Sequence, residues 1–108
     1  MDNIFQLPFP LPPTEVFEIL VQTDQVHIER IISPGQATPP DHWYDQKQDE
    51  WVILLQGQAI LSYEDGREVL LKAGDYLLIA AHEKHRVVET SADPPCIWLA
   101  IHGSLIEN

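Results

Sequence analysis

Residues 50–71 of the chain read EWVILLQGQAILSYEDGREVLL, and this stretch contains three short apolar runs separated by turn residues. The first two runs, residues 50–56 and 58–63, are joined by the single residue Gly57. The third, residues 67–71, follows the sequence E-D-G at positions 64–66, which is a typical hairpin turn. Runs of this length that are rich in Val, Ile, Leu and Tyr indicate β-strands, so the stretch predicts consecutive strands joined by tight turns.

The same pattern continues on both sides of this stretch. Residues 14–23 are ambiguous, because Thr14 could cap a helix, but the β-branched residues that follow favour a strand. With no long amphipathic helix in the sequence, seven or eight short, evenly spaced strands predict an all-β antiparallel sandwich or barrel. The remaining expected strands are residues 26–33, 76–80, 85–90 and 96–102.

The first residues of the chain differ from the rest, because residues 1–13, MDNIFQLPFPLPP, alternate proline with Phe and Leu. Proline fixes φ and lacks a backbone N–H, so this segment is predicted to be an extended arm. A single domain of residues 14–108 follows it. The apolar side chains of the arm need cover, either from the body of their own chain or from a second subunit, and the sequence leaves both alternatives open.

Some of the expected strands are apolar on both faces. Alternation places Val52 and Leu54 on one face of residues 50–55, and Trp51, Ile53 and Leu55 on the other. The strand at residues 96–102 has the same character. At least one sheet is therefore expected to be covered on its outer face. A homodimer packed sheet to sheet would supply that cover, and the N-terminal arm is the alternative.

Composition restricts the class of protein. A chain of 108 residues with 44% hydrophobic and 21% charged residues forms one folded domain. Its net charge of −11 would be repelled by nucleic-acid phosphates and anionic membranes, so neither is expected as a partner. The single cysteine, Cys96, excludes an intrachain disulfide and a cysteine-based zinc site. The sequence has neither a secretory leader nor a membrane-length apolar run, so a cytoplasmic location is expected.

Two segments resemble the motifs of the cupin superfamily, whose members are double-stranded β-helix or jelly-roll barrels. Residues 35–57 read GQATPPDHWYDQKQDEWVILLQG. The first family motif is a glycine, five residues, a His-x-His pair, three or four residues, a glutamate, six residues and a glycine. Gly35 matches its opening glycine, and Glu50 and Gly57 match its closing glutamate and glycine.

The second segment, residues 74–88, reads GDYLLIAAHEKHRVV. Gly74 and His85 match the glycine and histidine of the second family motif, with Ala80 at its proline position and His82 at its second glycine position. The string W-Y-D-Q-x-x-x-E-W-V is also similar to a subgroup of small single-domain bacterial cupins. The resemblance extends over residues 26–102 and implies the jelly-roll fold with a pocket at the mouth of the barrel.

The His-x-His pair of the family is missing from this chain. Counting back three or four residues from Glu50 leads to Gln46 or Asp45, and two residues further back to Tyr44 or Trp43. The metal cage of three histidines and one glutamate therefore does not carry over whole. Of its ligands, the resemblance carries over Glu50 and His85.

Imidazole and carboxylate groups suit a divalent metal such as Zn, Fe, Mn or Ni. The expected ligands are Glu50, His85 and Asp45, with His42 or His82 as the fourth; the competing interpretation of each is an ordinary strand-edge, turn or solvated side chain. Trp43, Tyr44 and His82 are expected to line the pocket. His27 and His102 are expected to be structural.

Two functions remain open from the sequence. The protein is either a small metal-dependent enzyme, such as an oxygenase or isomerase, or a metabolite-binding or sensing module with a degenerate metal site. In the first case, Tyr44 or His82 would be available for proton transfer. The retained Glu50 and His85 favour metal binding with a small-molecule ligand. Hydrolase and nucleotide-binding functions are disfavoured, because no Ser-His-Asp order or phosphate-binding glycine loop is present.

Overall fold

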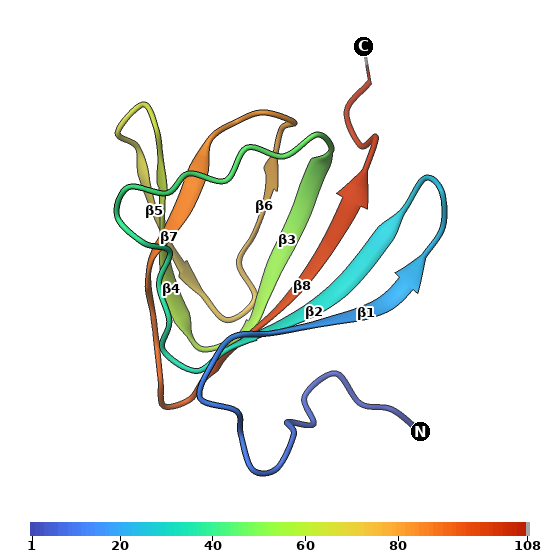
Figure 1. Cartoon of the computed structure of the whole chain (residues 1–108), viewed down its shortest axis with the longest axis vertical. Coiled ribbons are helices and arrows are strands. Elements are labelled where there is room, and N and C mark those ends of the chain that lie inside the picture. Colours follow the sequence, from blue (N-terminus) through green and yellow to red (C-terminus); the bar gives the residue numbers. More distant parts are fainter. Residues whose placement is uncertain (108) are drawn as a thin grey trace.

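The computed structural model describes residues 1–107 and contains eight β-strands and no helix in that range (Figure 1). All eight expected strands are present, and their ends differ from the expectation by two residues or fewer. The all-β prediction is therefore confirmed. The last residue of the expected domain, Asn108, lies outside the described residues. The strands are β1 (Val16–Gln22), β2 (His27–Ser33), β3 (Asp49–Gln56), β4 (Gln58–Tyr63), β5 (Glu68–Lys72), β6 (Tyr76–Ile79), β7 (His85–Thr90) and β8 (Cys96–Gly103).

The strands form two antiparallel sheets that face each other (Figure 1). The larger sheet has the order β1-β2-β8-β3-β6, and the smaller has the order β5-β4-β7. Strands that are distant in the sequence lie side by side, as β2 does with β8 and β3 does with β8. This arrangement is the jelly-roll barrel, in which alternate side chains of both sheets point into a shared interior.

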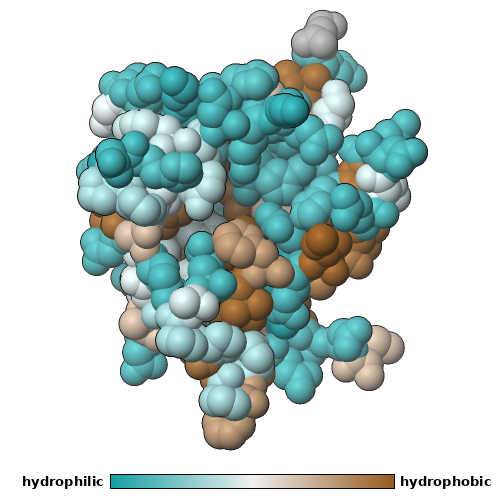
Figure 2. Space-filling model, in the orientation of Figure 1, coloured by the Kyte–Doolittle hydropathy of each residue, from teal (hydrophilic) through white to brown (hydrophobic). Residues whose placement is uncertain are grey.

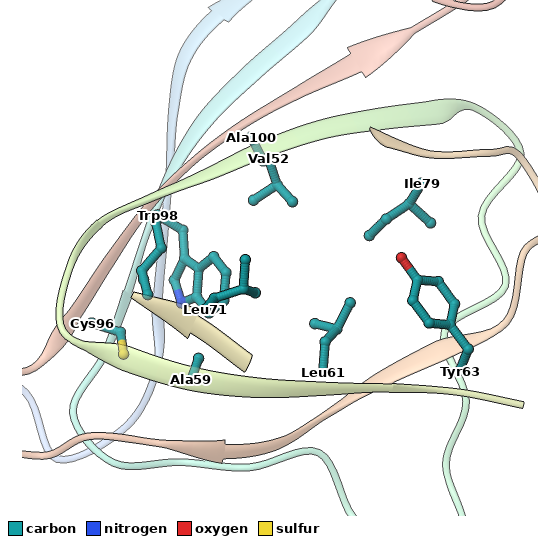
Figure 3. Close-up of a cluster of buried hydrophobic side chains, with 10 residues drawn as sticks. Val52, Ala59, Leu61, Tyr63, Leu71, Ile79, Cys96, Trp98 and Ala100 are labelled. Carbon is teal, nitrogen blue, oxygen red and sulfur yellow. The ribbon is translucent and has the colours of Figure 1, made fainter. Parts of the chain in front are cut away.

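The core lies in this interior, between the two sheets (Figure 3). On β3, for example, Val52 and Leu54 are 5% and 0% exposed, whereas Ile53 between them is only partly buried. Inward residues of β4, β5, β6 and β8 pack against them from the other strands. The labelled core residues are Val52, Ala59, Leu61, Tyr63, Leu71, Ile79, Cys96, Trp98 and Ala100.

The chain passes from the larger sheet to the smaller one at Gly57, between β3 and β4. Gly57 has a φ of +94°, and a Cβ atom there would lie 2.7 Å from Ser91 Oγ and 2.8 Å from Cys96 Sγ. Both the backbone conformation and the close contacts require glycine. The closing glycine of the first family motif therefore has a packing role, and it sets the position of β3 relative to β4.

The N-terminal arm contacts its own chain. Arg30 Nη1 donates hydrogen bonds to the backbone carbonyls of Ile4, at 3.1 Å, and Gln6, at 2.7 Å. Leu7 is half-buried, but Phe9 is 99% exposed. The arm is thus held against β1 and β2 while part of its apolar surface stays uncovered.

The free edge of the larger sheet is also apolar. Within residues 1–107 no strand pairs with the outer edge of β1, and Ile19, Leu20 and Val21 are each about half exposed. In the space-filling view, a patch of hydrophobic residues lies over the region of β1, among mainly hydrophilic surroundings (Figure 2).

Candidate functional site

A cavity of about 100 Å³ lies between the two sheets. Its apolar wall includes Val52, Leu61, Ile79 and Trp98, and these side chains continue the core. The polar side chains that line it come from both sheets, from the residue that precedes β1 and from the loop that precedes β3. They are Glu15, Glu29, Tyr44, Gln46, Glu50 and His85.

Glu50 points into the cavity because it alternates with the inward residues Val52 and Leu54 of β3. It is only 7% exposed, and no Lys or Arg side chain among the described residues contacts it. Burial raises the pKa of the Glu50 carboxyl group. The charges of His102 and His85 and a hydrogen bond from Gln46 act in the opposite direction but do not cancel that effect.

His85 is the first residue of β7 and is 5% exposed. Its Nε2 atom lies 4.0 Å from Glu50 Oε1. Its Nδ1 atom lies 2.9 Å from the backbone carbonyl oxygen of Glu83, which can only accept a hydrogen bond. In the neutral imidazole the proton is therefore on Nδ1, and the lone pair of Nε2 faces Glu50.

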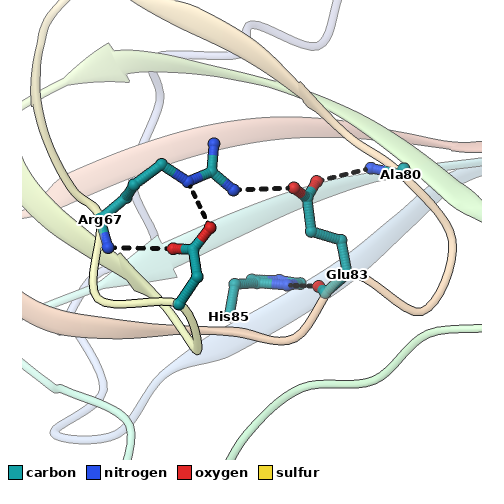
Figure 4. A network of polar contacts seen from close by, with 5 residues as sticks. Arg67, Ala80, Glu83 and His85 are labelled. Atoms are coloured by element: carbon teal, nitrogen blue, oxygen red, sulfur yellow. Dashed lines mark hydrogen bonds and ion pairs between the residues drawn. The ribbon is translucent and has the colours of Figure 1, made fainter.

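The loop that holds His85 is itself fixed by polar contacts (Figure 4). The Glu83 carboxylate accepts hydrogen bonds from the backbone N–H of Ala80 and from Arg67 Nη2, both at 3.1 Å. Arg67 also donates to Asp65 at 2.8 Å. These contacts hold the Glu83 carbonyl in the position that orients His85.

Tyr44 and Gln46 are placed beside His85 by backbone hydrogen bonds. The N–H of Tyr44 donates to the carbonyl of His85 at 2.8 Å, and the N–H of His85 donates back at 3.2 Å. The N–H of His82 donates to the carbonyl of Gln46 at 2.8 Å. The sequence left two pairs open for the positions of the missing histidines: Tyr44 with Gln46, or Trp43 with Asp45. The structure places Tyr44 and Gln46 in the cavity.

The two side chains differ in their polar contacts. Burial raises the pKa of the Tyr44 hydroxyl, so it is protonated at neutral pH and can donate a hydrogen bond. Gln46 Oε1 is buried and has no hydrogen-bond partner among the described residues. A buried acceptor of this kind is costly unless an ordered water or a ligand satisfies it.

Asp45, which the sequence suggested as a ligand, is not brought to Glu50 and His85. Because it lies between Tyr44 and Gln46 in an extended segment, its side chain points to the opposite side. There Asp45 Oδ1 lies 2.7 Å from Nδ1 of the exposed His82. His82 has a φ of +64°, a left-handed conformation that explains why the family has glycine at this position. Neither residue lines the cavity.

His42 and Trp43 also lie outside the cavity. His42 is exposed, and its ring packs edge-on against Tyr44 with the ring centroids 5.3 Å apart. Trp43 is covered by the guanidinium of Arg86, 5.0 Å from the ring centroid. Of the three residues expected to line the pocket, the structure therefore places only Tyr44 there.

Glu29, which the sequence analysis did not single out, lies between two histidines. Its carboxylate is 3.1 Å from His102 Nε2 and 3.3 Å from His27 Nε2. The hydrogen bond from His102 lowers the pKa of Glu29, and the same bond raises the pKa of His102. His102 is also the strand neighbour of Glu50. Alternation on β2 was the available signal, because Glu29 shares a face with the inward residue Ile31.

The resemblance to the cupin motifs implies a divalent metal, whose ligands would have to come from the side chains of the cavity. In residues 1–107, no three His, Cys, Asp or Glu side chains are arranged to hold a metal ion. Glu50 and His85 Nε2 supply two potential ligands. The unpartnered Gln46 Oε1 is a third, and amide oxygen is an accepted ligand of divalent cations. In their chemistry, one nitrogen and two oxygens, these three atoms suit a divalent cation.

The fold and the site define a small β-barrel protein with a largely apolar interior cavity into which a few polar side chains, Glu50 and His85 among them, are directed. The chain belongs to the cupin domain family, whose sequence profile matches residues 29–102. This confirms the resemblance seen in the two motifs. No curated protein matches the chain significantly.

Solved structures are similar over nearly the whole length. A Ralstonia eutropha JMP134 protein, named a "putative mannose-6-phosphate isomerase", has 40% identity and a TM-score of 0.89, with 97% of this chain and 98% of that one covered. A Thermus thermophilus protein has 20% identity and a TM-score of 0.76, with 96% of each chain covered.

A third similar structure is an RmlC-like cupin with a double-stranded β-helix fold from Methanocaldococcus jannaschii. It has 19% identity and a TM-score of 0.71, with 96% of this chain and 92% of that one covered. This likeness and the Thermus one show the fold alone. The described part of the chain has no helix long and apolar enough to cross a membrane. The cytoplasmic location stays a prediction.

Proposed function

We propose that the cavity binds a divalent metal ion through Glu50, His85 and Gln46, and that the ion and the surrounding residues bind a small organic ligand. The observation that carries this proposal is the buried Gln46 Oε1, which has no partner among the described residues and lines the same cavity as Glu50 and His85. A cation there would satisfy Gln46 and compensate the charge of the buried Glu50 carboxylate.

Each neighbouring residue has a role in this arrangement. The Glu83 carbonyl holds the proton of His85 on Nδ1, so that Nε2 is free to bind. Tyr44 presents a protonated hydroxyl that can donate a hydrogen bond to a ligand oxygen. When bound, a divalent ion acts as a Lewis acid that polarises such an oxygen.

The lining of the cavity restricts the ligand. No Lys or Arg among the described residues lines it, whereas three carboxylates, Glu15, Glu29 and Glu50, do. Arg30 is directed away, to Glu18 and the N-terminal arm. A phosphate ester would find no cationic side chain in the cavity. The ligand that fits best is small and uncharged. We therefore do not propose mannose 6-phosphate, the substrate in the name of the Ralstonia protein, as the ligand of this chain.

The test is a titration of chelator-treated protein with Mn²⁺ and Zn²⁺, followed by calorimetry. His85→Ala and Gln46→Leu each remove a proposed ligand, and Glu50→Leu removes the carboxylate without leaving an amide oxygen in its place. We expect affinity to fall about 10-fold or more in each. Asp45→Asn and His82→Ala are the matched controls and should bind like the wild type. Loss of binding in the controls but not in the first group would contradict the proposal.

A second candidate function is metabolite binding without a metal. It is favoured by the replacement of the two family histidines by Tyr44 and Gln46, which leaves only Glu50 and His85 of the usual ligand set. The same titration separates the two. If neither metal binds, and fluorescence of Trp98 at the cavity wall changes only with an uncharged metabolite, the metal-free function is correct.

A further inference from the structure

A row of apolar side chains leads from the edge of the larger sheet into the cavity. Phe17 on β1 is the strand partner of Ile31 on β2, and Ile31 is the strand partner of Trp98 on β8. All three side chains line the cavity. Exposure falls along the row, from 56% at Phe17 through the partly buried Ile31 to 5% at Trp98. Phe17 therefore lies where the cavity opens to solvent.

Ring-bearing side chains also line the cavity from its other walls. Tyr44 in the loop before β3 and His85 on β7 both line it. Their ring planes are inclined by only 31°, with the centroids 5.7 Å apart. Together with Phe17 and Trp98, they bring rings to the cavity from three strands and one loop. Aromatic side chains pack well against the face or edge of another ring, so this lining favours a ligand with a flat aromatic body.

The polar atoms of the cavity suit a hydroxyl group at one end of that body. The protonated Tyr44 hydroxyl can donate a hydrogen bond, and the buried Gln46 Oε1 is an acceptor without a partner among the described residues. A hydroxyl group both donates and accepts, so it can bond to both residues at once. The same oxygen can bind a cation held by Gln46 and Glu50. A carboxylate, by contrast, has no proton to donate and would be repelled by Glu50.

The size of the cavity determines where an aromatic body would lie. The volume of about 100 Å³ is smaller than the roughly 150 Å³ of an apolar protein cavity that binds benzene. A hydroxylated ring therefore does not fit wholly inside, and its outer part must pass the opening, where Phe17 is. Contact with the ligand would remove the apolar surface of Phe17 from water, which favours binding.

We propose that the ligand of the cavity is a small uncharged phenol, whose hydroxyl lies at Tyr44 and Gln46 and whose ring extends past Trp98 to Phe17. Phe17 is then the residue that selects ligands by the length of their apolar body. This inference rests on the proposed function, which assigns a small uncharged ligand to the same cavity. It adds the chemical class of that ligand and a contact at the opening.

The test is calorimetric titration of the full chain with phenol and with 4-ethylphenol, once after chelator treatment and once with Mn²⁺ added. We expect the wild type to bind 4-ethylphenol about 5-fold more tightly than phenol, because the ethyl group reaches Phe17. In Phe17→Ala, the dissociation constant for 4-ethylphenol should rise about 5-fold or more, and its advantage over phenol should disappear. Phe17 is more than half exposed, so the variant should fold, and far-ultraviolet circular dichroism checks this.

Phe9→Ala is the matched control, since it removes the same ring from a position that is 99% exposed and does not line the cavity. It should bind 4-ethylphenol like the wild type. Equal affinity of the Phe17→Ala and Phe9→Ala variants, or a wild type that binds neither phenol, would overturn this inference, and the Mn²⁺ titration would still decide the metal site separately. Binding of 4-ethylphenol that depends on Phe17, in a protein without affinity for Mn²⁺, would support the inference and contradict the metal site.

Discussion

Glu50 is the residue at which stability and the proposed function conflict most directly. Its carboxylate is buried beside apolar residues, and the nearest imidazole nitrogen, His85 Nε2, is 4.0 Å away. An isolated buried charge destabilises a fold, and proteins retain such groups mainly at binding and catalytic sites. The free energy of unfolding of the protein should therefore increase when this charge is removed.

We expect Glu50→Gln to raise the Tm of chelator-treated protein at pH 7. Burial raises the pKa of Glu50, so the folded state binds the proton more tightly than the unfolded state, and stability falls as pH rises above about 4.5. The neutral glutamine avoids this loss. A gain on the order of 1 kcal/mol, or about 4–8 °C, should be measurable by differential scanning fluorimetry. A variant that melts below the wild type would show that the carboxylate is well compensated.

The site could be predicted from the sequence only in part, and the reason is local geometry. Motif spacing located Glu50 and His85, because both stand at regular positions within strands. The choice between Gln46 and Asp45 depended on how the preceding segment pairs with His85, which the spacing does not specify. That pairing turns Gln46 inward and Asp45 outward.

At the scale of elements, the contact between β2 and β8 makes the free energy of unfolding depend on pH. Glu29 on β2 contacts His102 on β8 and His27 on its own strand, and Glu50 faces His102 from β3. The lowered pKa of Glu29 gives stability that is present above pH 4.5 and is lost as pH falls through its folded value. The raised pKa of His102 gives stability that is present below pH 6.5 and is lost as pH rises through its folded value.

The His102→Gln variant should therefore have a lower Tm than the wild type, and the difference in Tm should be largest between about pH 4.5 and pH 6.5. The difference should narrow on both sides of that range. Melting temperatures of both chelator-treated proteins at several pH values check this. An equal difference at every pH would mean that His102 acts through packing alone.

The elements themselves were predictable, whereas their order in space was not. Local alternation and turn residues such as Gly57 and Gly66 determine where strands begin and end. The neighbours of β8 are β2 and β3, which are far away in the chain, and their pairing depends on burial of the whole interior. Only the family resemblance indicated that arrangement before the structure did.

At the scale of the whole molecule, charge should govern which ligands enter. The chain carries 17 acidic and 6 basic side chains, and its cavity is lined by carboxylates. We expect mannose 6-phosphate at millimolar concentration to leave the Tm of the metal-free protein unchanged, because the phosphate has no cationic partner there. A clear rise in Tm with this ester, absent with inorganic phosphate, would mean that the cavity accepts sugar phosphates.

The most direct test of the proposed metal site is the metal content of the wild-type protein. Untagged protein would be purified without chelator, incubated with Zn, Mn, Fe and Ni in turn, freed of excess ion and analysed for each element. The proposed ligands Glu50, His85 and Gln46 predict close to one equivalent per chain for at least one metal. Negligible content of every metal after this treatment would contradict the metal site and leave a cupin barrel that binds its ligand without an ion.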